Sequence, residues 1–310
     1  MRALLLDPLR NRLLAALPQP DFALIARHLA TTSMPAGFVL NEVDDSVHQV
    51  YFPIKGMLSL LAILGNGKAI ETATVGREGV VNAMAGLGLL RSNVRVVVQI
   101  PLDVAFISAS HFSDAVAQST SIRNMCINYN EVLLIQAGVS AACNATHHVE
   151  ERFCRWVLQS SDRAESNTVS LTHELVAEML GVRRTSITRA AQKIQDTGAI
   201  KYSRGVIEIL NRPLLLKLSC ECYQTLSEKA AALFSQPRAV EPAGDVVRLT
   251  MTEAHDRPLS DDILSGGRSG WPAILSSLKS LLETGEALVI KMEPPKQMLA
   301  ALKAMGIETP

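Results

Sequence analysis

Arginine and hydroxyl side chains are concentrated in residues 171–200, LTHELVAEMLGVRRTSITRAAQKIQDTGAI. Arg184, Thr185 and Arg189 lie on the outward face of a helix that is predicted to begin near residue 184. An arginine on a helix that enters the major groove of DNA can donate two hydrogen bonds to the edge of one guanine. We therefore expect these three residues to read bases.

Phosphate groups of DNA are bound by cationic and hydroxyl side chains and by the amide ends of helices. The candidates for this role are Thr172, Arg183, Ser186, Lys201 and Arg204. Residues 200–209 alternate between apolar and polar types around Arg204-Gly205, which predicts a hairpin with these two residues at its tip. Such a wing would bring Lys201 and Arg204 to the DNA backbone beside the groove.

Two helices and a tight turn must hold these side chains in place. Thr172 can cap the first helix, and Gly181 is suited to end it because the turn needs a residue that tolerates positive φ. The second helix is predicted from about Arg184 to Thr197, with Ile187 and other apolar residues facing inward. The pattern indicates a helix–turn–helix.

Helix–turn–helix geometry also occurs in proteins that bind no DNA, so the charge pattern must decide between the two interpretations. The chain has 30 Lys and Arg residues against 30 Asp and Glu residues, and its formal net charge is zero. Arginines gathered at one helix start in a neutral chain, with a basic wing beside them, favour DNA binding.

The length of 310 residues suits two or three domains, and 48% apolar residues suffice for each to bury a core. The five cysteines are too scattered for a disulfide framework, which favours a reducing compartment. Asp7 and Pro8 interrupt the short apolar start, and no run approaches the roughly 20 apolar residues of a membrane span. We expect a cytoplasmic protein that does not enter a membrane.

The N-terminal half changes from helical to strand-like patterns. Residues 8–32 carry apolar positions at helical spacing and predict two short helices. Short β-branched runs separated by glycine follow, and Gly65-Asn66-Gly67 fits a hairpin turn that needs positive φ. This pattern predicts a small antiparallel barrel or roll. The predicted strands are residues 38–40, 50–52, 58–64, 69–75, 94–100 and 104–107.

Residues 110–144 return to helical spacing and carry an apolar stripe with the periodicity of a heptad seam. The stripe consists of Ile122, Met125, Tyr129, Val132, Gln136, Val139 and Cys143. One interpretation is a dimer seam, with Gln136 as a polar position that fixes its register; the other is a helix that packs on its own barrel. A second helix is predicted over residues 149–158, with a hinge near residues 144–148 and a break at residues 160–162.

Residues 145–210, and above all LGVRRTSITR at residues 180–189, resemble the winged helix–turn–helix of the Crp/Fnr family of transcription regulators. The order of roll, long helix and winged helix extends the resemblance over roughly residues 10–230. It implies an α+β protein that binds double-stranded DNA as a homodimer, is switched by an effector in the roll and is not an enzyme. RNA polymerase is an implied candidate partner. Family members often have glutamate at the position of Thr185, so we expect a different operator sequence.

Family members that bind cyclic AMP or cyclic GMP hold its phosphate with a Gly-Glu-Leu segment and a later Arg-Ser-Ala segment. The matching stretches are GREGVV at residues 76–81 and RSNVR at residues 91–95. The first stretch lacks the order of the motif, and the arginine of the second is one residue out of register. Both departures argue against the binding of a cyclic nucleotide. The alternative is that these arginines lie in solvated loops and bind no ligand. The candidate effector-binding residues are Arg77, Glu78, Arg91 and Ser92.

The sequence predicts no resident metal or cofactor. No cysteine precedes Cys126, which excludes the N-terminal iron–sulfur cluster of the oxygen-sensing branch of the family. Cys220 and Cys222 could ligate a metal, but two thiols alone favour ordinary helix packing. The histidines that could serve as haem ligands are expected on the surface; they are His28, His48 and His111.

The C-terminal seventy residues begin with a predicted linker at residues 236–244 and a strand at residues 246–252. Residues 266–285 then resemble the closing helix of START-like (SRPBCC) helix-grip domains, without the strands that complete such a fold. The alternative function is therefore a small-molecule-binding protein or enzyme of the helix-grip type, although no acid–base or nucleophile constellation supports it. The expected domains are a sensor roll at 1–120, a dimerisation helix at 121–144, a DNA-binding domain at 145–235, and a linker with a small α/β appendage at 236–310.

Overall fold

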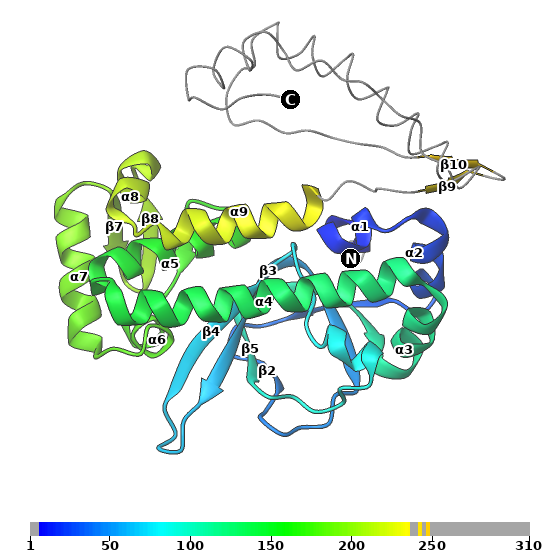
Figure 1. The fold of residues 1–310 in the computed structure, drawn as a ribbon. Helices are drawn as coiled ribbons and strands as arrows, with labels where there is room; N and C mark the ends of the chain where they lie inside the picture. The colour runs from blue at the N-terminus through cyan, green and yellow to red at the C-terminus, as the bar shows by residue number, and fades with distance from the viewer. Residues whose placement is uncertain (1–5, 236–240, 244–245, 249–310) are drawn as a thin grey trace, which may run out of the picture. The chain divides into compact units, whose positions relative to one another are not determined.

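The computed structural model describes residues 6–235, 241–243 and 246–248 (Figure 1). The chain divides into two units, Met1–Gln236 and Pro237–Pro310. In the second unit, β9 (Glu241–Ala243) pairs antiparallel with β10 (Val246–Arg248), which overlaps the predicted strand at residues 246–252. The START-like segment lies outside the described residues.

A β-roll forms the N-terminal part of the first unit. Its strands pair antiparallel in the order β1-β5-β3-β4, with β2 also on β5. A core that includes Phe52, Phe112 and Tyr129 fills its interior. The three short helices before the roll are η1 (Pro8–Arg10), α1 (Arg12–Ala16) and α2 (Gln19–Ala26). The strands are β1 (Ala30–Met34), β2 (Val39–Asn41), β3 (Gln49–Ile63), β4 (Ala69–Val75) and β5 (Arg95–Ser108), and η2 (Ala83–Leu87) lies between β4 and β5.

The turn between β3 and β4 follows the prediction, with Gly67 at φ +80°. The runs at residues 94–100 and 104–107, in contrast, are wrong as two strands, because they form the single strand β5. Pro101 interrupts the apolar pattern between them. Opposite it, Gly56 takes φ +91° in a bulged part of β3, so pairing continues past the proline. β1 is a further strand that the apolar runs did not indicate.

The long helix α4 (Thr120–Thr146) follows α3 (Ala109–Gln118) and packs on its own roll, so the prediction of a dimer seam on its apolar stripe is wrong. The buried members of the stripe are Ile122, Met125, Tyr129, Val132, Gln136 and Cys143, and half-buried Val139 packs beside Cys143. Gln136 does not fix a dimer register; its Oε1 accepts a hydrogen bond from the Thr74 amide at 3.2 Å. The heptad spacing thus marks the face that the roll and α9 (Cys222–Ser235) cover.

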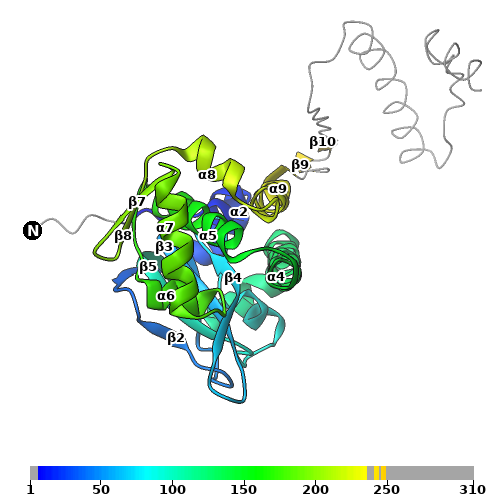
Figure 2. The same ribbon diagram turned by 90° about the vertical axis from the view of Figure 1, so that its left-hand side faces the viewer.

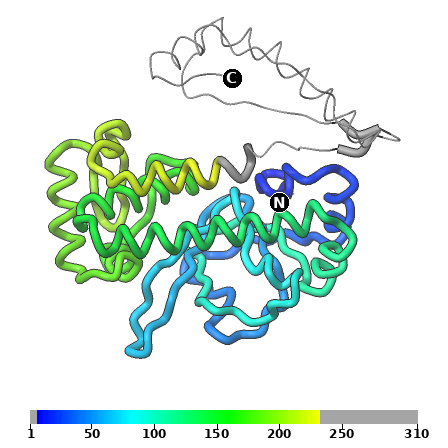
Figure 3. Tube along the Cα trace, viewed as in Figure 1, coloured from blue at the N-terminus to red at the C-terminus, as the bar shows by residue number. Residues whose placement is uncertain are grey.

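The C-terminal part of the first unit begins at one end of α4, away from α2 and α3, and its last helix, α9, runs back beside α4 (Figures 1 and 3). Its elements are α5 (Val149–Ala164), β6 (Thr168–Ser170), α6 (His173–Met179), α7 (Arg184–Asp196), β7 (Ile200–Ser203), β8 (Val206–Ile209), α8 (Arg212–Leu218) and α9. The three strands form a small sheet in the order β6-β8-β7. None of the described helices is both long and apolar enough to cross a membrane.

The break expected at residues 160–162 is wrong, because α5 continues to Ala164. Ser160 and Ser161 are buried, and the Ser161 hydroxyl donates a hydrogen bond to the Ser166 carbonyl at 2.8 Å. Serine runs are typical of loops, so these two buried serines on a helix led to the wrong prediction of a break. The chain does turn where the hinge was expected, since α4 ends at Thr146 and α5 begins at Val149.

Candidate nucleic-acid interface

The helix–turn–helix consists of α6, a short turn and α7. The Thr172 hydroxyl caps α6 by accepting a hydrogen bond from the Leu175 amide at 3.2 Å. Gly181, at φ +65°, then turns the chain, and the amide of Val182 donates to the Ala177 carbonyl at 2.9 Å. The inward residues of α7 are Ile187, Ala190, Ala191 and Ile194, each at most 3% exposed. This packing fixes which face of α7 points outward.

The predicted base-reading residues Arg184, Thr185 and Arg189 are all exposed on α7, which stands at the surface of this part of the molecule (Figure 2). The guanidinium of Arg184 forms an ion pair with Glu174 of α6 at 2.6 Å, and the two side chains are 66% and 62% exposed. Arg189 forms no ion pair within the described part of the chain. The structure therefore presents two guanidinium groups near the start of one accessible helix.

The predicted phosphate contacts lie around this helix. Thr172, Arg183, Lys201 and Arg204 are exposed, and Ser186 is half-buried in the first turn of α7. Arg204 and Gly205 have φ values of +50° and +77°, so they form the tip of the β7–β8 hairpin as the sequence predicted. The hairpin is adjacent to α7, so both could face one duplex (Figure 2).

A histidine–tyrosine contact that the sequence did not reveal connects the wing to both helices. The ring of His173, at the start of α6, stacks on Tyr202 of β7 with centroids 4.4 Å apart. Its Nδ1 hydrogen-bonds with the Thr188 hydroxyl of α7 at 3.0 Å, and the Tyr202 hydroxyl donates to the Leu171 carbonyl at 3.2 Å. Burial, and then the nearby charge of Arg184, lower the pKa of His173. The stacked ring and its hydrogen bond thus hold the wing against α7.

Comparison with known proteins agrees with this geometry. Residues 151–218 match the model of the Crp-like helix-turn-helix domain. These residues form a Crp-like helix–turn–helix domain. They run from α5 to the end of α8 and so include α6, α7 and the wing.

Solved structures of Crp/Fnr regulators share the fold of the first unit. A protein from Eubacterium rectale, described as a transcriptional regulator of the Crp/Fnr family, has a TM-score of 0.53 at 20% identity over 68% of this chain and 97% of its own. FixK2 from Bradyrhizobium japonicum has a TM-score of 0.53 at 16% identity over 62% and 98%. The c-di-GMP responsive regulator CLP from Xanthomonas campestris has 0.52 at 16% over 62% and 99%. No curated protein sequence matches the chain. The predicted α+β fold of roll, long helix and winged helix–turn–helix is confirmed.

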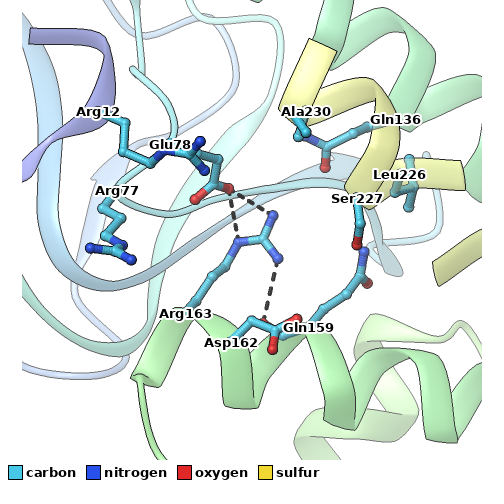
Figure 4. Close-up of a pocket in the computed structure, with 11 residues that line it drawn as sticks. Arg12, Arg77, Glu78, Gln136, Gln159, Asp162, Arg163, Leu226, Ser227 and Ala230 are labelled. Carbon is cyan, nitrogen blue, oxygen red and sulfur yellow. Dashed lines mark hydrogen bonds and ion pairs between the residues drawn. The ribbon is translucent and has the colours of Figure 1, made fainter. Parts of the chain in front are cut away.

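The predicted effector residues do not form one site. Arg77 and Glu78 border a hollow of about 230 Å³ between the roll, α5 and α9 (Figure 4). Glu78 is neutralised there by Arg163 of α5 at 2.8 Å, and Arg77 pairs with Glu165 at 3.0 Å. Both residues therefore connect the roll to the C-terminal end of α5 at the edge of this hollow.

Arg91 and Ser92 line a second hollow, of about 180 Å³, between η2 and α4. Ser92 is buried, and its hydroxyl donates to the Val94 carbonyl at 2.7 Å. Arg91 is exposed at the rim, where it donates to the Asp44 carbonyl at 3.3 Å. Most of the remaining lining is apolar and includes Leu133 of α4. This hollow offers one cation and an apolar wall.

A buried carboxyl group joins the roll to the DNA-binding part. Glu71 of β4 accepts hydrogen bonds from the Ser59 hydroxyl at 2.6 Å and from the indole of Trp156 at 2.9 Å. Glu71 and Trp156 are 8% and 1% exposed, and burial raises the pKa of Glu71. Because Trp156 belongs to α5, this contact holds the first helix of the matched domain against the sheet of the roll.

Proposed function

We propose that this chain is a sequence-specific, DNA-binding transcription regulator that acts as a homodimer and is switched by an effector bound in the roll. The observation that carries the proposal is the exposure of Arg184, Thr185 and Arg189 on the outward face of α7 in a Crp-like helix–turn–helix. With α7 in the major groove, Arg184 and Arg189 would donate hydrogen bonds to guanine, and Thr185 would contact an adjacent base. Contact with RNA polymerase stays a prediction of the sequence.

The positions of the candidate phosphate-binding residues support the same docking. Arg183 precedes α7 and Arg204 lies at the wing tip, so cations flank the base-reading helix on two sides. The Thr172 hydroxyl accepts its capping hydrogen bond and keeps its own proton to donate to a phosphate. Contacts of this kind position a protein on DNA, while the bases are read by α7.

The dimer would form on the opposite face of α4 from the one the heptad pattern indicated. Leu134 is 70% exposed and Ile127 is 47% exposed on this outward face. Gly138 and Ala141 continue it, and a Cβ added at Gly138 would meet no atom within 4 Å. An exposed apolar stripe along a helix of 27 residues suits pairing with the same helix of a second copy. A two-fold axis would then place the two α7 helices at half-sites about 34 Å apart.

The hollow beside η2 is the effector site we favour. It is bordered by Tyr129, Asn130 and Leu133 of α4, the helix that leads to the hinge before α5. A ligand with an apolar body and one anionic group would meet the lining and the guanidinium of Arg91. Such a ligand would switch the protein if it bound one position of α4 more tightly than another.

Selection from a library of random duplexes tests the proposal. The full chain should enrich a two-fold symmetric sequence with half-sites about one DNA turn apart. Arg189→Ala should bind the selected duplex roughly 5- to 150-fold more weakly per half-site, from the loss of about 1–3 kcal/mol. Arg27→Ala is the matched control, because Arg27 is exposed near α2, far from α7 in Figure 1. Failure to enrich any sequence at low salt, or equal binding by both variants, would refute the proposal.

A further inference from the structure

Four side chains of metal-ligand type meet where α4 ends and α9 begins. Their ligand atoms all lie within 4.8 Å of one another, and the three thiols among them are buried. Cys143 and His147 lie one helical turn apart and so share one face at the end of α4. Cys220 lies between α8 and α9, and Cys222 is the first residue of α9. The fold thus brings a C-x3-H pair and a C-x-C pair together from distant parts of the sequence.

The separations within this cluster suit a single tetrahedral ion. The Sγ atoms of Cys143 and Cys220 are 3.6 Å apart, and the Sγ of Cys222 is 3.6 Å from Nδ1 of His147. Zinc bonds of about 2.3 Å to sulfur and about 2.0 Å to nitrogen place two sulfurs about 3.8 Å apart, and a sulfur and a nitrogen about 3.5 Å apart, at tetrahedral angles. A disulfide, in contrast, has its sulfurs about 2.05 Å apart.

The surroundings of the cluster match those of metal ligands. Nε2 of His147 pairs with the Glu221 carboxylate at 3.1 Å, which leaves Nδ1 as the nitrogen that faces the thiols. A carboxylate behind a ligating histidine is the usual arrangement at zinc sites, because it fixes the tautomer and the orientation of the ring. His147 and Glu221 already have this arrangement, so neither side chain has to move for His147 to bind zinc.

Buried positive charge lies beside the thiols. Arg152 and Arg155 of α5 are each 5% exposed and interact electrostatically with the Cys143 sulfur. Neither arginine forms an ion pair with a carboxylate in the described ranges. A zinc ion with three thiolates and one neutral imidazole carries a net charge of −1, and a buried anion of this kind would offset the cost of the two buried guanidinium groups.

The remaining two cysteines lie outside the cluster. Cys126 and Cys154 are buried in the two main cores, and burial raises the pKa of each thiol to about 12. Neither belongs to a group of ligand-type residues among those the structure describes. These two thiols therefore serve as internal controls for the clustered ones.

We propose that Cys143, His147, Cys220 and Cys222 bind one zinc ion per chain. The ion would join the end of α4 to the start of α9 and close a loop between Cys143 and Cys220, which are 77 positions apart, and this loop contains the helix–turn–helix and the wing. Binding energy at such a structural site contributes directly to folding. The bound ion would therefore hold the DNA-binding part to the long helix, close to the hinge between α4 and α5. The metal site itself does not depend on whether the chain binds DNA.

Metal analysis of the full chain, purified without chelators, is the first test. Elemental mass spectrometry should find one zinc per chain. Exchange of the zinc for Co²⁺ should give the visible bands of tetrahedral cobalt and the near-ultraviolet charge-transfer band of cobalt–thiolate bonds. A wild-type chain that takes up neither ion overturns the proposal, as does one in which Cys143 and Cys220 form a disulfide and no metal is bound.

Variants test which residues hold the ion. Cys222→Ser should lower the zinc content well below one per chain, whereas Cys126→Ser and Cys154→Ser should retain a full equivalent. Glu221→Gln keeps all four ligands, so the chain should still fold; its zinc affinity in chelator competition should fall about 10- to 100-fold. Equal zinc loss in the cluster and control variants would overturn the assignment.

Discussion

Replacing Glu174 by glutamine should strengthen DNA binding through Arg184. The two side chains form an ion pair at 2.6 Å on the surface that is proposed to face DNA. Arg184 must leave this carboxylate before it can reach a guanine, so the free protein holds one of the proposed base-reading residues in a competing contact. Glutamine removes the charge of the partner and keeps its size.

The expected magnitude follows from the exposure of the pair. With the two side chains 66% and 62% exposed, the ion pair is strongly screened and is worth about 0.2–1 kcal/mol. A homodimer breaks two such pairs on one operator, which gives about 0.4–2 kcal/mol in total. The affinity of the dimer for its selected duplex should therefore rise roughly 2- to 30-fold.

Fluorescence anisotropy with the selected duplex at fixed salt measures this gain. Glu178→Gln is the matched control, because Glu178 is also exposed on α6 but pairs with no cation among the described residues. In an Arg184→Ala background, Glu174→Gln should give a smaller gain, since no ion pair is left to break. The same gain from Glu178→Gln, or an undiminished gain without Arg184, would attribute the effect to net charge and refute the reasoning.

Three further predictions concern the dimer face, the core of the recognition helix and the buried carboxyl group. Leu134→Glu on the exposed face of α4 should shift the chain toward monomer in sedimentation and weaken operator binding at least tenfold, and an unchanged dimer would exclude this face. Ile187→Ala should lower the free energy of unfolding by about 2–5 kcal/mol in urea, because a fully buried side chain leaves a cavity; a loss under 1 kcal/mol would contradict the packing. Burial raises the pKa of Glu71 above its usual value of 4.5, so the folded state favours the protonated carboxyl group. The stability that this preference contributes is complete below pH 4.5 and is lost as the pH rises through the pKa of the folded state. Glu71→Gln should therefore flatten the fall in stability above pH 4.5, and a parallel pH profile for the two proteins would contradict this origin.

The DNA-binding half was predictable because its signals are local. A hydroxyl cap at Thr172, a glycine at the turn and apolar spacing after Arg184 all act within a few residues of where they lie. The helix expected from Arg184 to about Thr197 spans Arg184–Asp196, and the wing tip lies at Arg204-Gly205 as predicted.

The partner of α4 was not predictable in the same way. Periodicity shows that a stripe is buried, but it does not show by what. Two faces of this helix carry apolar residues, and the roll covers the one that contains Tyr129 and leaves Leu134 exposed. Only the path of the chain through space separates these alternatives.

The thiol cluster was missed because its two halves are distant in sequence. Cys220 and Cys222 alone gave a weak signal, and Cys143 was assigned to the apolar stripe of the long helix. The signal that could have linked them is the C-x3-H spacing of Cys143 and His147 at the end of a helix, which is compatible with one ion. The sequence also did not show that the candidate effector residues divide between two places, since Arg77 and Arg91 lie close in sequence but border different hollows.

Whether α7 reads bases is tested by replacing a guanine in the selected duplex with 7-deazaguanine, which removes the N7 acceptor from the major groove and leaves base pairing intact. If Arg189 of α7 reads that guanine, the substitution should weaken binding of the wild-type chain by about 1–3 kcal/mol and should leave the already weaker binding of Arg189→Ala nearly unchanged. If no guanine of the duplex shows this dependence on Arg189, or on Arg184 in the corresponding experiment, then α7 does not read DNA through the major groove and the account is contradicted.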